Sequence, residues 1–137
     1  MTIIIPGRPK TKKNSQMIVT AKSKTGKTCY RLLQSQSYRD YEAAALRHLS
    51  TYSGPRYIGI PVEVVCYYYL PNRQGWPDLM GLYQATADIL EAAGIINNDR
   101  NIITMGDTRI AGIDPTNPRT EIMITPTQAP SWFPIKS

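Results

Sequence analysis

The sequence predicts a small single domain of the α+β class, with two main helices packed on a mixed or antiparallel sheet. The chain has 137 residues, enough for one hydrophobic core and too few for two. Strand-like and helix-like segments follow one another as strand, hairpin, helix, strand, helix, strand, strand, which is not the regular alternation of a parallel α/β fold. We expect this domain to span residues 1–126 and a proline-rich tail to occupy residues 127–137.

The N-terminal part predicts one short strand and one β-hairpin. Ile3 to Ile5 is an apolar run that stops at a Pro-Gly pair, as a strand followed by a turn would. Residues 16–21 and 28–33 have strand-like composition and flank the turn-rich segment KSKTGK. The hairpin should therefore carry a basic tip.

Two helices follow from apolar residues at helical spacing. The first is expected to be capped by Ser35 or Ser37 and to run to about Tyr52. The second should run from Leu79 to about Ala93, where a glycine stops it. The expected buried stripe of the first helix consists of Tyr38, Tyr41, Ala45 and Leu49.

Between and after the helices, three segments predict strands. Residues 60–70 form the strongest strand, rich in β-branched and aromatic residues, and their imperfect alternation predicts that both faces are at least partly covered. Residues 102–111 and 119–125 are expected to form an antiparallel pair. The tail carries Trp132 and Phe133 and is either loose or docked on a neighbour.

Charge is distributed unevenly along the chain. The first 39 residues contain nine Lys and Arg and no acid, whereas the remainder has seven bases and ten acids, which together give the net charge of +6. A basic arm joined to a mildly acidic body is typical of a protein that binds phosphates with one part and a cation with the other. The alternative is a solvated basic loop without a ligand.

Several classes of function are disfavoured by the sequence. His48 is the single histidine and lies within the first helix, where a surface or core role is far more common than catalysis. Cys29 and Cys66 lack the spacing of a zinc site. No apolar run approaches a membrane span, and the first residues lack the layout of a secretory signal, so a cytoplasmic location is expected.

Two acidic residues stand at the ends of the second predicted helix and its following turn. Asp78 and Asp99 could hold Mg²⁺, which prefers oxygen ligands and retains several waters. Each has a structural alternative, because Asp78 stands where a helix N-cap belongs and Asp99 could make an Asx-turn. The residues alone leave both interpretations open.

The segment WPDLMGLYQATADILEAAGIINND, from Trp76 to Asp99, resembles the signature region of the RusA-type Holliday junction resolvases. In that family an Asp-x-Asp-Asn-Leu-x-Lys segment opens a helix with a later Asp, and a Gly, an apolar turn and an Asp-Asp pair follow. The matching positions, with no gap required, are Asp78, Leu82, Asp88, Gly94 and Asp99. The N-terminal segment IIIPGRPKTKKNS also resembles the family's opening strand and basic loop.

The resemblance implies a RusA-like fold in which Asp78 and Asp99 are catalytic and bind Mg²⁺, with Mn²⁺ as an alternative. It also exposes departures, since Met80 replaces the family's second Asp and Gln84 its Lys. Gly81 and Asn98 replace an Asn and the first Asp of the pair. Asp88 lies too far along the helix from Asp78 to share one ion, about 15 Å along the axis. Asp107 and Glu63 are the other candidate substitutes for the lost ligand.

The expected partner is branched or four-way-junction DNA, bound by a homodimer and cut by metal-dependent hydrolysis in recombination and repair. The runner-up is a non-catalytic junction-binding protein that has lost part of its metal site. Tyr67, Tyr68 and Tyr69 could stack on bases, although core or interface roles are more common for a tyrosine-rich strand. The residues expected to contact phosphates are Arg8, Lys10, Lys12, Lys13, Lys22, Lys24 and Lys27.

Overall fold

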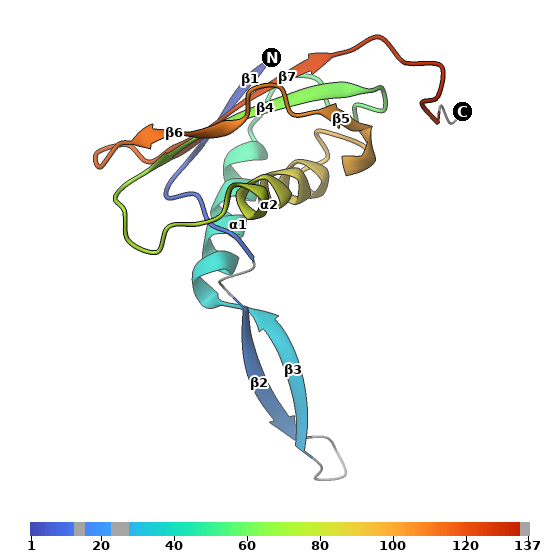
Figure 1. The fold of residues 1–137 in the computed structure, drawn as a ribbon. Coiled ribbons are helices and arrows are strands. Elements are labelled where there is room, and N and C mark those ends of the chain that lie inside the picture. The colour runs from blue at the N-terminus through green and yellow to red at the C-terminus, as the bar shows by residue number, and fades with distance from the viewer. Residues whose placement is uncertain (13–15, 23–27, 135–137) are drawn as a thin grey trace.

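The structure of the protein is a computed structural model that describes residues 1–12, 16–22 and 28–134, with the backbone alone for residues 16–22 and 28–34. It is a single α+β domain, as predicted, with a five-stranded mixed sheet and two helices (Figure 1). Its elements are β1 (Thr2–Pro6), β2 (Gln16–Lys22), β3 (Thr28–Gln34), α1 (Gln36–Leu49), β4 (Val62–Leu70), α2 (Leu79–Ala92), the 3₁₀ helix η1 (Asp99–Asn101), β5 (Ile102–Thr104), β6 (Arg109–Ile113) and β7 (Arg119–Pro126).

The sheet is organised around β4. Strand β7 lies between β1 and β4 and is antiparallel to both. Strands β5 and β6 both pair in parallel with β4, near its start and near its end respectively. The expected antiparallel pairing of residues 102–111 with residues 119–125 is therefore wrong. A turn at residues 105–108, with Gly106 at φ +56°, divides that segment in two, and the apolar β4 takes partners along both of its edges.

Both helices cover one face of the sheet (Figure 1). Because successive side chains of a strand point to opposite faces, alternate residues of β4 form the inner layer of the core. Those residues are Val62, Val64, Cys66, Tyr68 and Leu70, all at most 1% exposed. Ile122 and Ile124 of β7 and Ile3 and Ile5 of β1 continue this layer across the sheet. Burial of this apolar surface is the main force that holds the helices on the sheet.

Two buried side-chain hydrogen bonds are seen between α2 and β4 in the described part of the chain. The Tyr68 hydroxyl lies 2.8 Å from the Thr86 hydroxyl, which itself donates to the carbonyl of Leu82 at 3.0 Å. The Tyr83 hydroxyl donates to the carbonyl of Val64 at 2.7 Å. Buried polar groups are costly unless they are hydrogen-bonded, so these bonds also fix the register of α2 on the sheet. Tyr68 is thus a core residue and is not available for base stacking.

The helix ends were largely predicted. Ser35 caps α1 by accepting a hydrogen bond from the Tyr38 backbone N–H at 3.2 Å. Helix α2 ends at Ala92 with Ala93 as its C-cap, and the next residue, Gly94, has a φ of +72° that a residue with a side chain rarely adopts. The Arg56 guanidinium donates to the carbonyls of Leu49, Tyr52 and Ala93, and so satisfies backbone groups at the C-terminal ends of both helices.

The predicted hairpin is present as β2 and β3, paired antiparallel from Gln16 opposite Gln34 to Lys22 opposite Thr28. It extends away from the sheet and the two helices (Figure 1). In the tail, Phe133 is buried and Trp132 is 70% exposed, so the two neighbouring aromatic residues differ in environment. Among the residues described, no helix is long and apolar enough to cross a membrane.

Candidate functional site

Asp78 is the N-cap of α2, which is the structural role that its position predicts. Its Oδ2 accepts a hydrogen bond from the Gly81 backbone N–H at 3.0 Å. A Cβ added at Gly81 would lie 2.7 Å from Asp78 Oδ1 and 3.1 Å from the Thr11 side chain. Position 81 is therefore crowded by the Asp78 carboxylate, its nearest neighbour, and by Thr11 of the basic arm, so a larger residue there would require these side chains to shift. This packing gives a physical reason for Gly81, one of the departures noted above.

Asp99 is presented differently. It begins η1, and the Asx role in this turn belongs to its neighbour Asn98, whose Oδ1 accepts from the Arg100 N–H at 3.0 Å. The Asp99 backbone N–H donates to Glu91 Oε1 at 2.8 Å, which anchors the turn to α2. Within the described part of the chain, the Asp99 carboxylate is exposed and has no hydrogen-bond or ion-pair partner. The backbone of Asp99 is thus anchored to α2, and its carboxylate is exposed to solvent.

A hollow of about 280 Å³ lies beside Asp99, between α2 and β5. We call it the Asp99 hollow. Met80 and Gln84, two of the departures from the resolvase pattern, lie in its wall, whereas Asp78 is not among its lining residues. The lining residues are Met80, Tyr83, Gln84, Ala87, Asp99, Ile102, Ile103, Thr104 and Met105. The structure therefore brings Asp99 together with Met80 and Gln84, and places Asp78 next to Thr11 instead.

The donor set around Asp99 fits a metal ion only in part. Among the residues that the structure describes, no three His, Cys, Asp or Glu side chains gather as metal ligands. The Asp99 hollow offers one carboxylate, the Gln84 amide and two thioethers, and a thioether is a poor ligand for Mg²⁺. Mg²⁺ is nevertheless commonly held by one or two carboxylates together with waters and substrate phosphates. The residues fit an ion shared with a bound phosphate, and not a cage built by the protein alone.

None of the candidate substitutes for the lost carboxylate lines this hollow. Asp88 forms an ion pair with Lys12 at 2.8 Å and accepts a hydrogen bond from Gln84 at 3.0 Å. Asp107 accepts hydrogen bonds from the Tyr67 hydroxyl at 2.8 and 2.9 Å. The Glu63 carboxyl lies close to Gly106 in the turn between β5 and β6. Asp88 and Asp107 are therefore engaged with other side chains.

Lys12 and Asp88 connect the basic arm to the Asp99 hollow. Lys12 also lies over the Tyr38 ring, with its Nζ 5.8 Å from the ring centroid, so the arm contacts both helices. Asp88 accepts a hydrogen bond from Gln84, and Gln84 lines the Asp99 hollow. The side chains of Lys12, Asp88 and Gln84 therefore form a continuous polar chain from the arm to the Asp99 hollow.

The other predicted phosphate contacts are described to different extents. The Arg8 guanidinium donates to the carbonyl of Gln74, and both Arg8 and Lys10 are half-buried. For Lys22 the structure describes the backbone at the end of β2 and not the side chain. Lys13, Lys24 and Lys27 lie outside the described residues.

Tyr83 contributes a phenol to the wall of the Asp99 hollow. Burial, chiefly, together with Cys66 and Glu63, raises the pKa of its hydroxyl well above the ordinary value. The hydroxyl therefore stays protonated and serves as a donor to the Val64 carbonyl. Its hydroxyl is thus part of the hydrogen bonding that joins α2 to β4.

Two residues of the site were not identified from the sequence. Glu91 positions the backbone of Asp99, and the only signal was an acidic residue in the last turn of the second helix, where acids are unfavourable. Trp76 is 50% exposed although it directly precedes the buried Pro77. The signal for Trp76 was the presence of a large aromatic residue in a polar loop. The segment that resembles the resolvases begins at Trp76, but the resemblance gives this residue no role.

Comparison of the chain with known proteins does not assign it to a family. No family model matches the chain, and no curated protein matches it either. The resemblance to the RusA-type resolvases stays a prediction from the segment between Trp76 and Asp99 and from the N-terminal arm.

Proposed function

We propose that this protein is a metal-dependent, structure-selective endonuclease that cuts branched DNA in recombination and repair, in the manner of the RusA-type resolvases. The observation that supports the proposal is the exposed Asp99 carboxylate, which lies beside a hollow. The polar chain of Gln84, Asp88 and Lys12 connects this hollow to the basic arm. Phosphodiester DNA supplies the phosphate that the arm would bind and that the incomplete ligand set requires.

Each residue of the site has a distinct role in this proposal. Asp99 is the central carboxylate, and Glu91 positions it through the backbone hydrogen bond of 2.8 Å. Asp78 caps α2 with Oδ2, which leaves Oδ1 as the oxygen that can face a ligand. A bound Mg²⁺ or Mn²⁺ ion would activate a water and stabilise the leaving oxygen of the cut strand. Gln84 offers its amide to a phosphate where the resolvase pattern has a charged Lys.

The basic arm and the hairpin would hold the DNA backbone. The cations proposed for this task extend from Arg8 through the hairpin, and lie on the part of the chain that contains no acid before Asp40. Their contribution is electrostatic and independent of sequence, so the affinity should fall steeply with salt. The hairpin projects from the domain and can reach a DNA arm that the body does not touch (Figure 1).

We further propose that the protein acts as a homodimer. A four-way junction has approximate two-fold symmetry, so a two-fold dimer can place one Asp99 hollow at each of two opposed strands. The face of the sheet that the helices leave uncovered carries Tyr67 and Tyr69, and an arginine lies over each ring. The Arg109 Cζ is 5.1 Å from the Tyr67 ring centroid, and the Arg119 Cζ is 4.0 Å from the Tyr69 ring centroid. This face is the surface that we assign to the second copy.

A second candidate is a junction-binding protein without catalytic activity. It is favoured by Met80 and Gln84 in the wall of the Asp99 hollow and by the capping role of Asp78. In this alternative the protein would retain the arm and the fold, and it would bind junctions equally well with and without divalent metal.

The test is the incubation of the protein with a labelled synthetic four-way junction and with a linear duplex of the same sequence, in Mg²⁺, Mn²⁺ or chelator. The proposal expects paired nicks in the junction that need metal, and little or no cutting of the duplex. Tight junction binding in chelator with no cuts in either metal would establish the non-catalytic alternative. Equal binding and cutting of both substrates would contradict recognition of the branch.

A further inference from the structure

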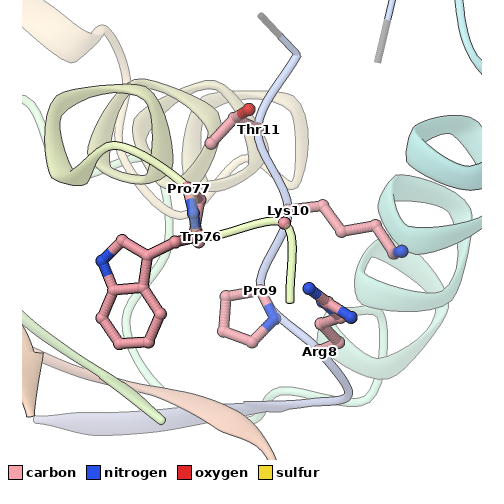
Figure 2. A pocket seen from close by; sticks show the side chains of 7 residues that line it. Arg8, Pro9, Lys10, Thr11, Trp76 and Pro77 are labelled. Carbon is pink, nitrogen blue, oxygen red and sulfur yellow. The ribbon is translucent and has the colours of Figure 1, made fainter. Parts of the chain in front are cut away.

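A second hollow, of about 410 Å³, lies where the basic arm passes the loop that precedes α2 (Figure 2). We call it the Trp76 hollow. It is built from two segments that are far apart in the chain, residues 8–11 and residues 75–77. Among the described residues, its lining includes two cations, one large aromatic ring and no carboxylate: Arg8, Pro9, Lys10, Thr11, Gly75, Trp76 and Pro77.

The walls of the Trp76 hollow are held in a defined arrangement. Pro9 and Pro77 are both buried, and a proline ring fixes its own backbone φ. The Arg8 guanidinium donates to the carbonyl of Gln74, which ties the arm to the loop. Gly75 has φ +57°, and a Cβ placed there would lie 3.5 Å from Arg8 Nη2. The loop can turn here because position 75 is glycine, and the turn presents Trp76.

Trp76 is not used by the core, because half of its surface is exposed to solvent. Figure 2 shows its indole on one side of Pro9 and the side chains of Arg8 and Lys10 on the other side. An exposed aromatic plane close to two cations is the combination that proteins use to bind unpaired nucleotides, since the ring stacks on the base and the cations contact phosphates. Every base has a flat π face, so such a site needs no particular sequence.

We propose that the Trp76 hollow binds an unstacked nucleotide at the branch of the DNA, with the Trp76 indole against the base and Arg8 and Lys10 on the flanking phosphates. This inference rests on the proposed function, because it supplies the means by which a branched DNA is distinguished from a duplex. A linear duplex keeps its bases stacked and offers none to Trp76, whereas a branch point exposes bases at a low cost.

The position of the Trp76 hollow relative to the other site supports this role. Thr11 lies in its wall, and the Thr11 Cγ2 lies 3.1 Å from the position that a Cβ of Gly81 would take at the start of α2. Met80 of the same helical turn lines the Asp99 hollow. A nucleotide held at Trp76 would thus fix the DNA branch at the end of α2 where the Asp99 hollow begins.

The experiment uses the full chain with Trp132→Phe, which leaves Trp76 as the only tryptophan of the two. Titration with a four-way junction and with oligothymidine should quench the fluorescence of Trp76, and titration with linear duplex should quench it much less. In the wild-type background, Trp76→Ala should weaken junction binding by about tenfold, and Trp76→Phe, which keeps a stacking ring, by much less. Trp132→Phe alone serves as the matched control and should bind as the wild type does.

The outcomes separate this inference from the proposed function. Unchanged junction affinity in a folded Trp76→Ala variant, with no quenching in the single-tryptophan protein, would overturn the nucleotide site while the endonuclease proposal stands. Quenching by oligothymidine without any preference for the junction would support the site and contradict the proposed recognition of branched DNA. Circular dichroism of each variant establishes that it is folded, and the comparison of Trp76→Phe with Trp76→Ala distinguishes loss of stacking from loss of structure.

Discussion

Lys12 and Asp88 form an ion pair, with 2.8 Å between Lys12 Nζ and Asp88 Oδ2, that attaches the N-terminal arm to α2. Their side chains remain 35% and 31% exposed, so the pair is screened by solvent and should contribute less than about 1 kcal/mol to stability. The larger consequence concerns DNA. Asp88 neutralises one of the cations that the arm would otherwise offer to phosphates.

We therefore predict that Asp88→Asn raises the affinity for DNA by about two- to threefold. The logarithm of the affinity should also fall more steeply with the logarithm of the salt concentration, by the amount expected for about one additional phosphate contact. The salt dependence of binding to a labelled junction measures both effects. Lys12→Ala should change them in the opposite direction, and Asp40→Asn, on the exposed side of α1, is the matched control. Weaker binding by Asp88→Asn would mean that the ion pair positions the arm and that neutralisation of Lys12 is secondary.

The two roles of Asp78 can be separated by two substitutions. Asp78→Ala removes the cap of α2 and should lower the free energy of unfolding by about 1 kcal/mol, whereas Asp78→Asn retains a capping oxygen and should lower it much less. Urea denaturation measures this difference. If Asp78 also holds the metal, Asp78→Asn should reduce cleavage at least tenfold in a protein of nearly wild-type stability. Full cleavage by Asp78→Asn would restrict Asp78 to the capping role.

Met80 provides a gain-of-function test. Its side chain is 62% exposed in the wall of the Asp99 hollow, so Met80→Asp should fold normally. The substitution adds a hard oxygen ligand at the position where the resolvase pattern has its second Asp, and we predict that it lowers the Mg²⁺ concentration needed for half-maximal cleavage. Met80→Leu is the matched control and should leave this concentration unchanged. An unchanged metal requirement in Met80→Asp would place the metal elsewhere.

Cys66 predicts the behaviour of the fold at alkaline pH. Burial raises the pKa of its thiol from 9.0 to about 12, because the thiolate is disfavoured in the core. The unfolded chain therefore loses this proton first, so the associated stability is fully present below about pH 9 and is lost as the pH rises towards 12. In a Cys29→Ser background, the free energy of unfolding should fall by up to about 1.4 kcal/mol per pH unit within this window.

The measurement is urea denaturation between pH 7 and pH 10, with Cys66→Ala compared in the same background. Removal of the thiol should leave a flatter pH dependence, whatever it costs in absolute stability. An equal slope in both proteins would assign the alkaline loss to other groups, of which the buried Tyr68 is the first to consider, since burial also raises its pKa.

The elements with strong local signals were predicted correctly from the sequence. The apolar spacing of Tyr38, Tyr41, Ala45 and Leu49 identified the inward stripe of α1, in which Tyr41 is partly buried and the other three are buried. Gly94 identified the end of α2. The predicted antiparallel pairing of the last strands was wrong, because β5 and β6 pair in parallel with β4 through contacts between distant segments. A local sequence pattern predicts that a segment forms a strand, whereas tertiary contacts determine which strand it pairs with.

In the candidate site, too, local features could be predicted from the sequence and the contacts between distant residues could not. The resemblance singled out Asp78 and Asp99 as candidate ligands, and this role stays a prediction. The structure gives Asp78 the cap of a helix and Asp99 an exposed position beside a hollow. The grouping of Asp99 with Met80 and Gln84 depends on how the turn after α2 returns along that helix. The role of Glu91 depends on one backbone hydrogen bond across eight residues, which no motif encodes.

The most direct test of the central claim, that Asp99 is the carboxylate of a junction-cutting site, is single-turnover cleavage of a labelled four-way junction in Mg²⁺ by the wild type, Asp99→Asn and Asp40→Asn. We predict paired nicks by the wild type and by Asp40→Asn, and a loss of at least a hundredfold in Asp99→Asn with junction binding retained. Cleavage by Asp99→Asn at the rate of the wild type would contradict this assignment of the site.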